Sequence, residues 1–439
     1  MISRREMLKA TGLGLLGASC SGWAPLLADE LAAAGQRRRH CVLLWMTGGP
    51  TQTDTFDMKP GHANGGEFKE IATNAPGLRF SEHLPKLAGM ADRLAVVRGL
   101  STKEGDHGRG TYLMRTGRQP MGPVRFPTIG SALGKELGDD TSGIPSFVSI
   151  SPYRAFNQAA FGPGFLGPKY APLTVGATDN FQGNEQDAEG YARLQVDDLQ
   201  SGVATGRFDK RLQLWDTLQQ RFLASRPAAA AVAQDTVYRK AVKLMNSEAA
   251  RAFDLSAEPE AVRDAYGRGR FGQGCLMARR LIEQGVSFVE VSLGSVAGNS
   301  FAWDTHQDNF NAVKALSAEL DAGWSMLMQD LADRGLLEST TILWMGEFGR
   351  TPKINDNAGR DHFPAAWTAV LAGGGIAGGQ AYGQTSDDGM EVTDGKVDVG
   401  DLLATFTAAA GIPAERENIS EVGRPIKIAE GTPIAELLA

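Results

Sequence analysis

Short runs of apolar residues alternate with helix-like patterns along most of the chain. Runs without polar alternation are typical of strands that are buried on both faces of a parallel sheet. Apolar positions at Val313, Leu316, Leu320 and Trp324 repeat every three to four residues and predict a helix that follows such a run. Strands separated by helices favour parallel pairing with right-handed crossovers. The main apolar runs lie at residues 41–46, 94–100, 146–150, 286–293, 340–345 and 365–371.

This pattern predicts an α/β fold, with a central, mainly parallel sheet and helices on both faces. The domain spans residues 40–439, and its last predicted helix covers Val399–Gly411. Residues 182–284 differ in character, because they carry long amphipathic helical patterns, an alanine-rich run at Ala228–Ala233 and few β-branched clusters. We interpret that region as a helical insertion packed on the sheet.

The first residues predict export from the cytoplasm. Ser3-Arg-Arg-Glu-Met-Leu-Lys9 is a twin-arginine pattern, and a mildly apolar stretch follows it to about Leu27. Pro25 would interrupt a membrane-spanning helix, so residues 1–30 are expected to be a signal peptide that the twin-arginine export machinery recognises. The expected location is the periplasm or the extracellular space. Cys20 lies in a segment that resembles a lipoprotein cleavage site, and its lipidation is left open.

Composition narrows the function classes. Apolar residues make up 42% and charged residues 22% of the chain, as in soluble globular proteins. There are 44 basic and 51 acidic residues, net −7, and no basic run beyond the signal flank, which argues against nucleic-acid binding. No later stretch is apolar enough to span a bilayer. Cys41 and Cys275 are expected to be two buried free thiols rather than a disulfide.

Aspartate and histidine occur together in three short motifs near predicted strand ends. Only six histidines are present, and three of them lie in Asp106-His107, Asp304-Thr-His306 and Asp361-His362. Open α/β sheets place their ligand sites beyond the carboxyl ends of their strands. Imidazole and carboxylate together suit zinc, with manganese and calcium as alternatives. The residues predicted to bind a divalent metal are Asp54, Asp304, His306, Glu347, Asp361 and His362.

Two of these carboxylates have a competing structural interpretation. Asp54 follows the first strand, and together with Thr53 it would equally well cap a turn. Glu347 follows the strand 340–345 directly and is either a ligand or the partner of Arg350. Three arginines stand beside the motifs: Arg109, Arg350 and Arg360. Guanidinium groups bind phosphate or sulfate through paired hydrogen bonds, or they neutralise clustered carboxylates.

The chain contains five longer motifs: Leu44-Trp-Met-Thr-Gly-Gly-Pro-Thr-Gln-Thr-Asp54, Asp106-His-Gly-Arg-Gly-Thr-Tyr112, Trp303-Asp-Thr-His306, Met345-Gly-Glu-Phe-Gly-Arg-Thr-Pro352 and Gly359-Arg-Asp-His-Phe-Pro364. Together they resemble one family of exported bacterial proteins, the domain-of-unknown-function 1501 family, over nearly the whole mature chain. This family in turn resembles the alkaline phosphatase and sulfatase superfamily. That resemblance implies hydrolysis of phosphate or sulfate esters, small or polymer-linked, at a metal site on a parallel sheet.

The superfamily's metal ligands map onto this sequence only in part. Its first-strand aspartate corresponds to Asp54, a later aspartate and histidine to Asp304 and His306, and its last histidine to His362. The intervening Asp-His pair falls on Glu347 and Phe348, which removes one imidazole.

The nucleophile departs further from the superfamily pattern. Aligning the superfamily's Thr-Gly pair to Thr116-Gly117 places His107 at the nucleophile position and Thr111 where an arginine is usual. No Cys-x-Pro-x-Arg signature is present. His107, Arg109 and Thr111 are therefore the catalytic candidates, with water, Thr102 or Thr111 as the attacking group. The alternative is a non-catalytic envelope protein, for binding or scaffolding, with a degenerate metal site.

Overall fold

The computed structural model describes residues 38–439 apart from Met121 and residues 140–142, 177–193, 197–198, 200, 227, 297–298 and 300. The predicted signal peptide, residues 1–30, and the first part of the predicted insertion lie outside the described residues. In the part that is described, no helix is long and apolar enough to cross a membrane.

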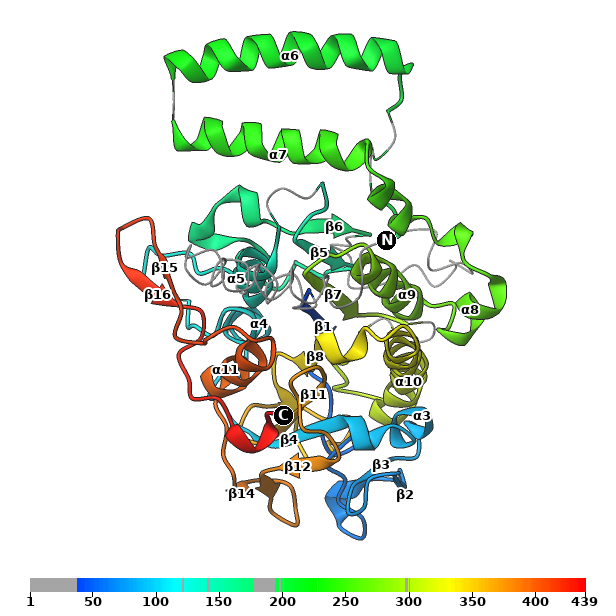
Figure 1. The fold of residues 1–439 in the computed structure, drawn as a ribbon. Helices are drawn as coiled ribbons and strands as arrows, with labels where there is room; N and C mark the ends of the chain where they lie inside the picture. Colours follow the sequence, from blue (N-terminus) through cyan, green and yellow to red (C-terminus); the bar gives the residue numbers. More distant parts are fainter. Residues whose placement is uncertain are drawn as a thin grey trace, which may run out of the picture. The chain divides into compact units, whose positions relative to one another are not determined.

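Eight strands of the described chain form one sheet in the order β12-β4-β11-β8-β1-β7-β5-β6 (Figure 1). Six of them, all except β6 and β12, correspond to the apolar runs that predicted strands. The strands are β1 (His40–Met46), β4 (Leu94–Leu100), β5 (Phe147–Ile150), β6 (Leu173–Val175), β7 (Phe288–Leu293), β8 (Thr340–Gly346), β11 (Trp367–Gly373) and β12 (Gln380–Tyr382).

The pairing confirms a mainly parallel sheet. β1 pairs in parallel with β7 and β8, and β5 pairs in parallel with β6 and β7. The exception is β11, which is antiparallel to both β8 and β4. The chain between β8 and β11 folds into the small hairpin of β9 (Gly349–Arg350) and β10 (His362–Phe363) rather than a crossover helix, so β11 returns beside β8 in the opposite direction.

Helices cover both faces of the sheet (Figure 1). On β1, Val42, Leu44 and Met46 face one apolar core, and Cys41, Leu43 and Trp45 face the other. α3, α9 and α10 contribute to the first core, and α4, α5 and α11 contribute to the second. The helices are α3 (Pro85–Ala88), α4 (His107–Thr116), α5 (Ile129–Leu137), α6 (Thr205–Ser225), α7 (Ala229–Met245), α8 (Glu260–Ala265), α9 (Arg270–Glu283), α10 (Asn309–Asp333) and α11 (Val399–Ala409).

The described part of region 182–284 includes the helices α6, α7, α8 and α9, which differ in burial. α9 is a buried helix of the first core, and its buried residues include Phe271, Cys275 and Leu281. α6 and α7 instead form a helical hairpin whose side chains are largely exposed. Three further two-stranded sheets lie outside the main sheet: β2 (Glu70–Ala72) with β3 (Arg79–Ser81), β13 (Gln384–Thr385) with β14 (Val392–Asp394), and β15 (Glu417–Ile419) with β16 (Pro425–Lys427).

Cys41 and Cys275 are both free and fully buried, one in each core. Burial raises the pKa of both thiols. We therefore expect neither thiol to react with a disulfide reagent such as DTNB in the native protein, and both to react once denaturant exposes them. Counting released thiolate with and without denaturant checks this, and a rapid stoichiometric reaction of the native protein would contradict the burial of these residues.

Candidate metal centre

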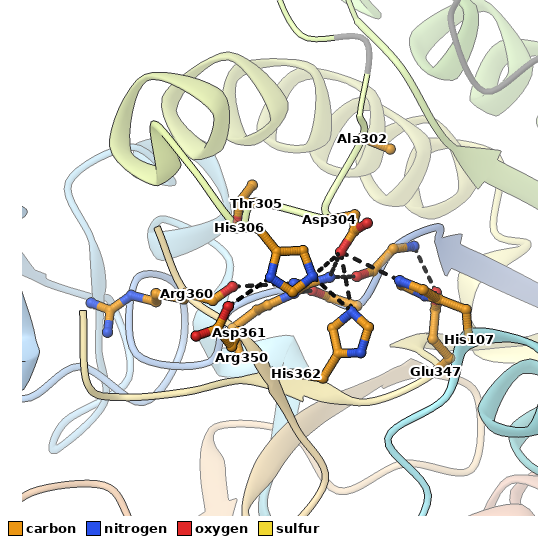
Figure 2. A network of polar contacts seen from close by, with 12 residues as sticks. His107, Ala302, Asp304, Thr305, His306, Glu347, Arg350, Arg360, Asp361 and His362 are labelled. Carbon is orange, nitrogen blue, oxygen red and sulfur yellow. Dashed lines mark hydrogen bonds and ion pairs between the residues drawn. The ribbon is translucent and has the colours of Figure 1, made fainter. Parts of the chain in front are cut away.

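Four side chains converge at the carboxyl end of the sheet, and we call them the His/Asp cluster: His107, Asp304, His306 and His362. Figure 2 shows them pointing toward one another. His107 begins α4 after the loop that follows β4, and Asp304 and His306 lie in the loop between β7 and α10. His362 lies in β10, beyond β8. The structure thus brings together the three Asp-His motifs that the sequence singled out.

The contacts centre on one oxygen atom, Asp304 Oδ1. The Nε2 atoms of His107, His306 and His362 lie 3.3, 3.1 and 3.3 Å from it. The Nε2 atoms of His306 and His362 are also only 3.0 Å apart. His107, Asp304 and His362 are half-buried and have potential ligand atoms within 4.8 Å of one another.

Each histidine is held in place through its other ring nitrogen. The Nδ1 atom of His107 lies 2.8 Å from Glu347 Oε1, and that of His306 lies 2.7 Å from Asp361 Oδ1. His362 Nδ1 lies 2.8 Å from the carbonyl oxygen of Gly105. Acceptors at Nδ1 keep the proton there and direct the Nε2 lone pair inward, which is the usual outer support of a metal-binding histidine.

This donor set fits a divalent cation. Neutral imidazoles that turn Nε2 lone pairs toward each other and toward a carboxylate repel unless a proton or a cation lies between them. Donors about 2.0–2.1 Å from a tetrahedral zinc ion lie roughly 3.3–3.4 Å apart, close to the spacings around Asp304 Oδ1. The geometry is therefore suitable for a divalent ion held by His107, Asp304 and His362. His306 lies beside these three ligands, 3.0 Å from His362.

The start of α4 sets the position of His107. The Asp106 side chain accepts a hydrogen bond of 2.9 Å from the Arg109 amide and caps the helix. The helix therefore begins at His107. The His107 ring stacks on Phe156, with centroids 4.3 Å apart, and contacts Phe348 at 5.0 Å.

Two glycines allow the loops of the site to approach closely. Gly48, in the turn after β1, has φ +105°, and a Cβ there would lie 2.5 Å from the Asp304 amide nitrogen. A Cβ on Gly359 would lie 1.9 Å from the His306 carbonyl oxygen. Glycine at these two positions avoids both clashes. The Gly48 amide also donates a hydrogen bond of 2.9 Å to Glu347 Oε1.

Glu347 and Arg350 are buried residues that contact members of the His/Asp cluster. Glu347 is 1% exposed, and its Oε1 atom bonds both His107 and the Gly48 amide, while its Oε2 atom has no hydrogen-bond partner. Arg350 is fully buried and donates to Asp304 and to the carbonyl oxygens of Gly48, Gly49 and Arg360. Glu347 therefore orients His107, and Arg350 has no nitrogen left open for a substrate anion.

Asp54 is engaged elsewhere. Arg360 donates to both of its oxygens, at 2.7 and 2.8 Å, and Thr51 and Asn309 donate to Oδ2. Asp54 and Arg360 are both fully buried. The structure thus pairs a predicted metal ligand with a predicted anion-binding residue, because a carboxylate without water around it needs a fixed counter-charge.

The remaining candidate residues are Arg109 and Asp361, which are exposed, and Thr111, which is buried. The Arg109 side chain is 62% exposed, and its Nε atom bonds Glu104 at 2.8 Å, so it is the most accessible of the three arginines. The Thr111 hydroxyl is buried, with the residue 1% exposed, and has no hydrogen-bond partner. Asp361 supports His306 rather than joining the Nε2 atoms at Asp304, and its side chain is 54% exposed.

Sequence reasoning missed the groups that hold the cluster through the backbone. The Gly105 carbonyl and the Gly48 amide act through atoms that every residue has, so no residue type reveals them. Phe156, which stacks on His107, follows β5 in a loop whose residues carried no recognised motif.

The metal-free cluster favours a protonated His107. Burial lowers the pKa of His107, but hydrogen bonds and charge interactions with Asp304 and Glu347 raise it by more, to about 9. A folded-state pKa above the unfolded value of 6.5 stabilises the metal-free fold fully below about pH 6.5, and this stabilisation is lost as the pH rises through about 9.

Metal binding should show the opposite dependence on pH. Because a metal must displace the proton on His107 Nε2, we expect its affinity to rise about tenfold per pH unit between pH 7 and pH 9. Competition with a chelator of known proton affinity at several pH values measures this change. An affinity that stays constant over that interval would contradict a ligand role for His107.

Comparison with solved structures finds chains of similar arrangement but low identity. Ps i-CgsB in complex with k-i-k-neocarrahexaose has a TM-score of 0.45 and 12% identity, with coverage of 90% of this chain and 75% of that chain. The PsFucS1 sulfatase from Pseudoalteromonas sp. has a TM-score of 0.42 and 13% identity, with coverage of 88% and 70%. A protein in the alkaline phosphatase superfamily from Vibrio parahaemolyticus has a TM-score of 0.36 and 12% identity, with coverage of 86% and 67%.

A search of curated proteins found no match to this chain. A family model does match it, over residues 38–438, and is described as a protein of unknown function, DUF1501. That match spans nearly all of the chain beyond the predicted signal peptide and includes every residue of the His/Asp cluster. The chain belongs to the DUF1501 family.

Proposed function

We propose that the protein is an exported, metal-dependent hydrolase of phosphate or sulfate esters. The observation that supports this most strongly is the convergence of three Nε2 atoms on Asp304 Oδ1, each with its Nδ1 atom held by an acceptor. In the proposed site, His107, Asp304, His306 and His362 hold the metal. Glu347 and Asp361 orient two of the histidines, and Arg350 balances the charge of Asp304.

The chemistry suits hydrolysis of an oxyanion ester. A bound divalent ion supplies a Lewis acid that polarises an oxygen of the transferred group. Arg109, exposed at the rim beside His107, is placed to contact the remaining oxygens of that group once it leaves Glu104. His306 is the most exposed of the three histidines, with 44% of its side chain accessible, so substrate approaches from its side.

The donor set favours zinc, with manganese as the nearest alternative. Three imidazole nitrogens and one carboxylate oxygen match the ligands of tetrahedral zinc. Calcium prefers six to eight oxygen ligands, which this cluster does not offer. Water is the expected attacking group, because the Thr111 hydroxyl is buried in the core and the chain has no cysteine or serine among the cluster residues.

Export follows from the twin-arginine pattern at Arg4 and Arg5. Replacing both by lysine is expected to keep the protein in the cytoplasm, as fractionation of cells would show. Delivery of the folded protein by this route also allows the metal to be loaded before export.

Ester turnover tests the proposed activity. The purified protein, loaded with zinc or manganese, is expected to hydrolyse p-nitrophenyl phosphate or p-nitrophenyl sulfate, and His306→Ala should abolish turnover while the fold, followed by circular dichroism, survives. His83→Ala, which changes a histidine outside the cluster, serves as the matched control. A protein that binds metal stoichiometrically but hydrolyses neither ester would instead support the non-catalytic envelope protein.

A further inference from the structure

The helical hairpin of α6 and α7 has one face that holds the two helices together. On α6, Phe208, Leu212, Trp215, Gln219 and Leu223 are only partly exposed and repeat every three to four residues. Trp215 stacks on Tyr238 of α7, with centroids 4.2 Å apart. This interior face accounts for the pairing of the helices and leaves an adjacent face of α6 to solvent.

This adjacent face of α6 combines large apolar and basic side chains. Leu214, Leu218 and Phe222 are spaced four residues apart and are 61%, 56% and 43% exposed. Arg211 and Arg207 lie three and seven residues before Leu214, and Arg221 lies three residues after Leu218. All three are exposed and lie on the same stripe. We call these six residues the α6 outer stripe.

The two acidic residues of α6 lie away from this stripe. Asp216 turns toward α7, where its Oδ1 atom accepts a hydrogen bond of 2.7 Å from Arg239. Asp209 lies two residues after Arg207, on the other side of the helix. The α6 outer stripe therefore carries only positive charge.

The hairpin also differs in charge from the rest of the chain. Residues 204–246 contain eight basic and three acidic residues, net +5, whereas the whole chain has a net charge of −7. The remainder therefore carries a net charge of −12. A basic segment in an acidic protein indicates a negatively charged partner for that segment alone.

The chemistry of the stripe distinguishes between partners. Two copies of a hairpin with net charge +5 repel each other, which disfavours self-association through this face. Leucine and phenylalanine interleaved with arginine on a single helix face match the interface of a bilayer, where the apolar groups enter the acyl boundary and the guanidinium groups bind phosphates. α6 is not apolar enough to span a membrane, so it would lie along the membrane surface.

We propose that the α6 outer stripe binds the surface of an anionic phospholipid bilayer and tethers the protein there. The His/Asp cluster takes no part in this contact, so the proposal stands independently of the hydrolase activity.

Vesicle flotation tests the proposal with the purified protein. We expect binding to phosphatidylcholine vesicles that contain phosphatidylglycerol, weak binding to pure phosphatidylcholine, and loss of binding as salt screens the charges. Two double variants, Leu214→Gln with Leu218→Gln and Arg207→Gln with Arg211→Gln, should each lower the partition coefficient at least about tenfold. Helical content and metal content should stay at the wild-type values, because the changed side chains are exposed.

The β15–β16 hairpin supplies a matched control surface. It also exposes Ile419 and Val422, at 65% and 69%, but acidic residues flank them. Arg424→Gln with Lys427→Gln removes two positive charges there and should leave vesicle binding unchanged. Equal binding by wild type and both α6 variants would overturn the proposal. So would a concentration-dependent dimer in sedimentation that the leucine variant dissociates, because the stripe would then be a contact between copies.

Discussion

Asp304→Asn is expected to remove the metal from the protein and with it any ester hydrolysis. The Oδ1 atom of Asp304 is the point on which all three Nε2 atoms converge. His107, His362 and Arg350 all lower the pKa of Asp304, against the effect of burial, so the carboxylate is ionised throughout the neutral range. An amide supplies no negative charge and turns N–H groups toward the site in one of its two orientations. Metal affinity should fall at least about a hundredfold.

Asp308→Asn is the matched control for this variant. It makes the same chemical change in the same loop, at a residue whose backbone has φ 46°, which asparagine tolerates as well as aspartate does. The Asp308 side chain accepts a hydrogen bond from Asn311 and lies outside the His/Asp cluster. Isothermal titration with zinc compares the variants. Equal zinc affinity for wild type and Asp304→Asn would place the metal elsewhere.

Arg360→Ala is expected to lower the free energy of unfolding by about 3–5 kcal/mol, because it leaves the Asp54 carboxylate buried without its counter-charge. Arg360 is fully buried, bonds both oxygens of Asp54, and also donates to carbonyl oxygens of Asn64, Thr351 and Pro352. Its removal therefore breaks the contacts that hold the loop after β1 against the β9–β10 hairpin. Urea unfolding followed by circular dichroism measures the change.

Arg109→Ala is the appropriate comparison, since it removes the same side chain from an exposed ion pair. Because Arg109 is 62% exposed, its loss should leave the unfolding free energy nearly unchanged. A second variant, Asp54→Asn, separates the structural role of Asp54 from a ligand role. It should keep one metal per chain while lowering stability. Loss of the metal in Asp54→Asn, without loss of stability, would restore Asp54 as a ligand.

Six of the eight strands of the main sheet were predictable, because they are buried on both faces. The edge strands β6 and β12 are only partly buried and were not predicted. A strand such as β1, in which every residue is buried, has no polar positions to interrupt its apolar run. The direction of β11 was not predictable, because its apolar run looks the same in either orientation. The deciding feature is the β9–β10 hairpin, which is formed by two residues from each side and has no strand-like pattern.

The histidines of the site were predictable and the carboxylates only partly. Three Asp-His motifs in a chain with six histidines pointed to one place, and the structure brings their histidines together. For Asp54 and Glu347 the sequence left two interpretations, because a carboxylate after a strand looks alike whether it faces a cation or an internal partner. The partner of Asp54 is Arg360, 306 residues away in the chain, and local patterns carry no information about such a contact.

Elemental analysis of the purified, folded protein, prepared without chelators, tests for a metal at the His/Asp cluster. We expect one zinc or manganese ion per chain in the wild type and in His83→Ala, and loss of that ion in both His306→Ala and His362→Ala. A folded wild-type protein that contains no stoichiometric metal, and takes up none when zinc or manganese is added, would contradict a metal centre at the His/Asp cluster.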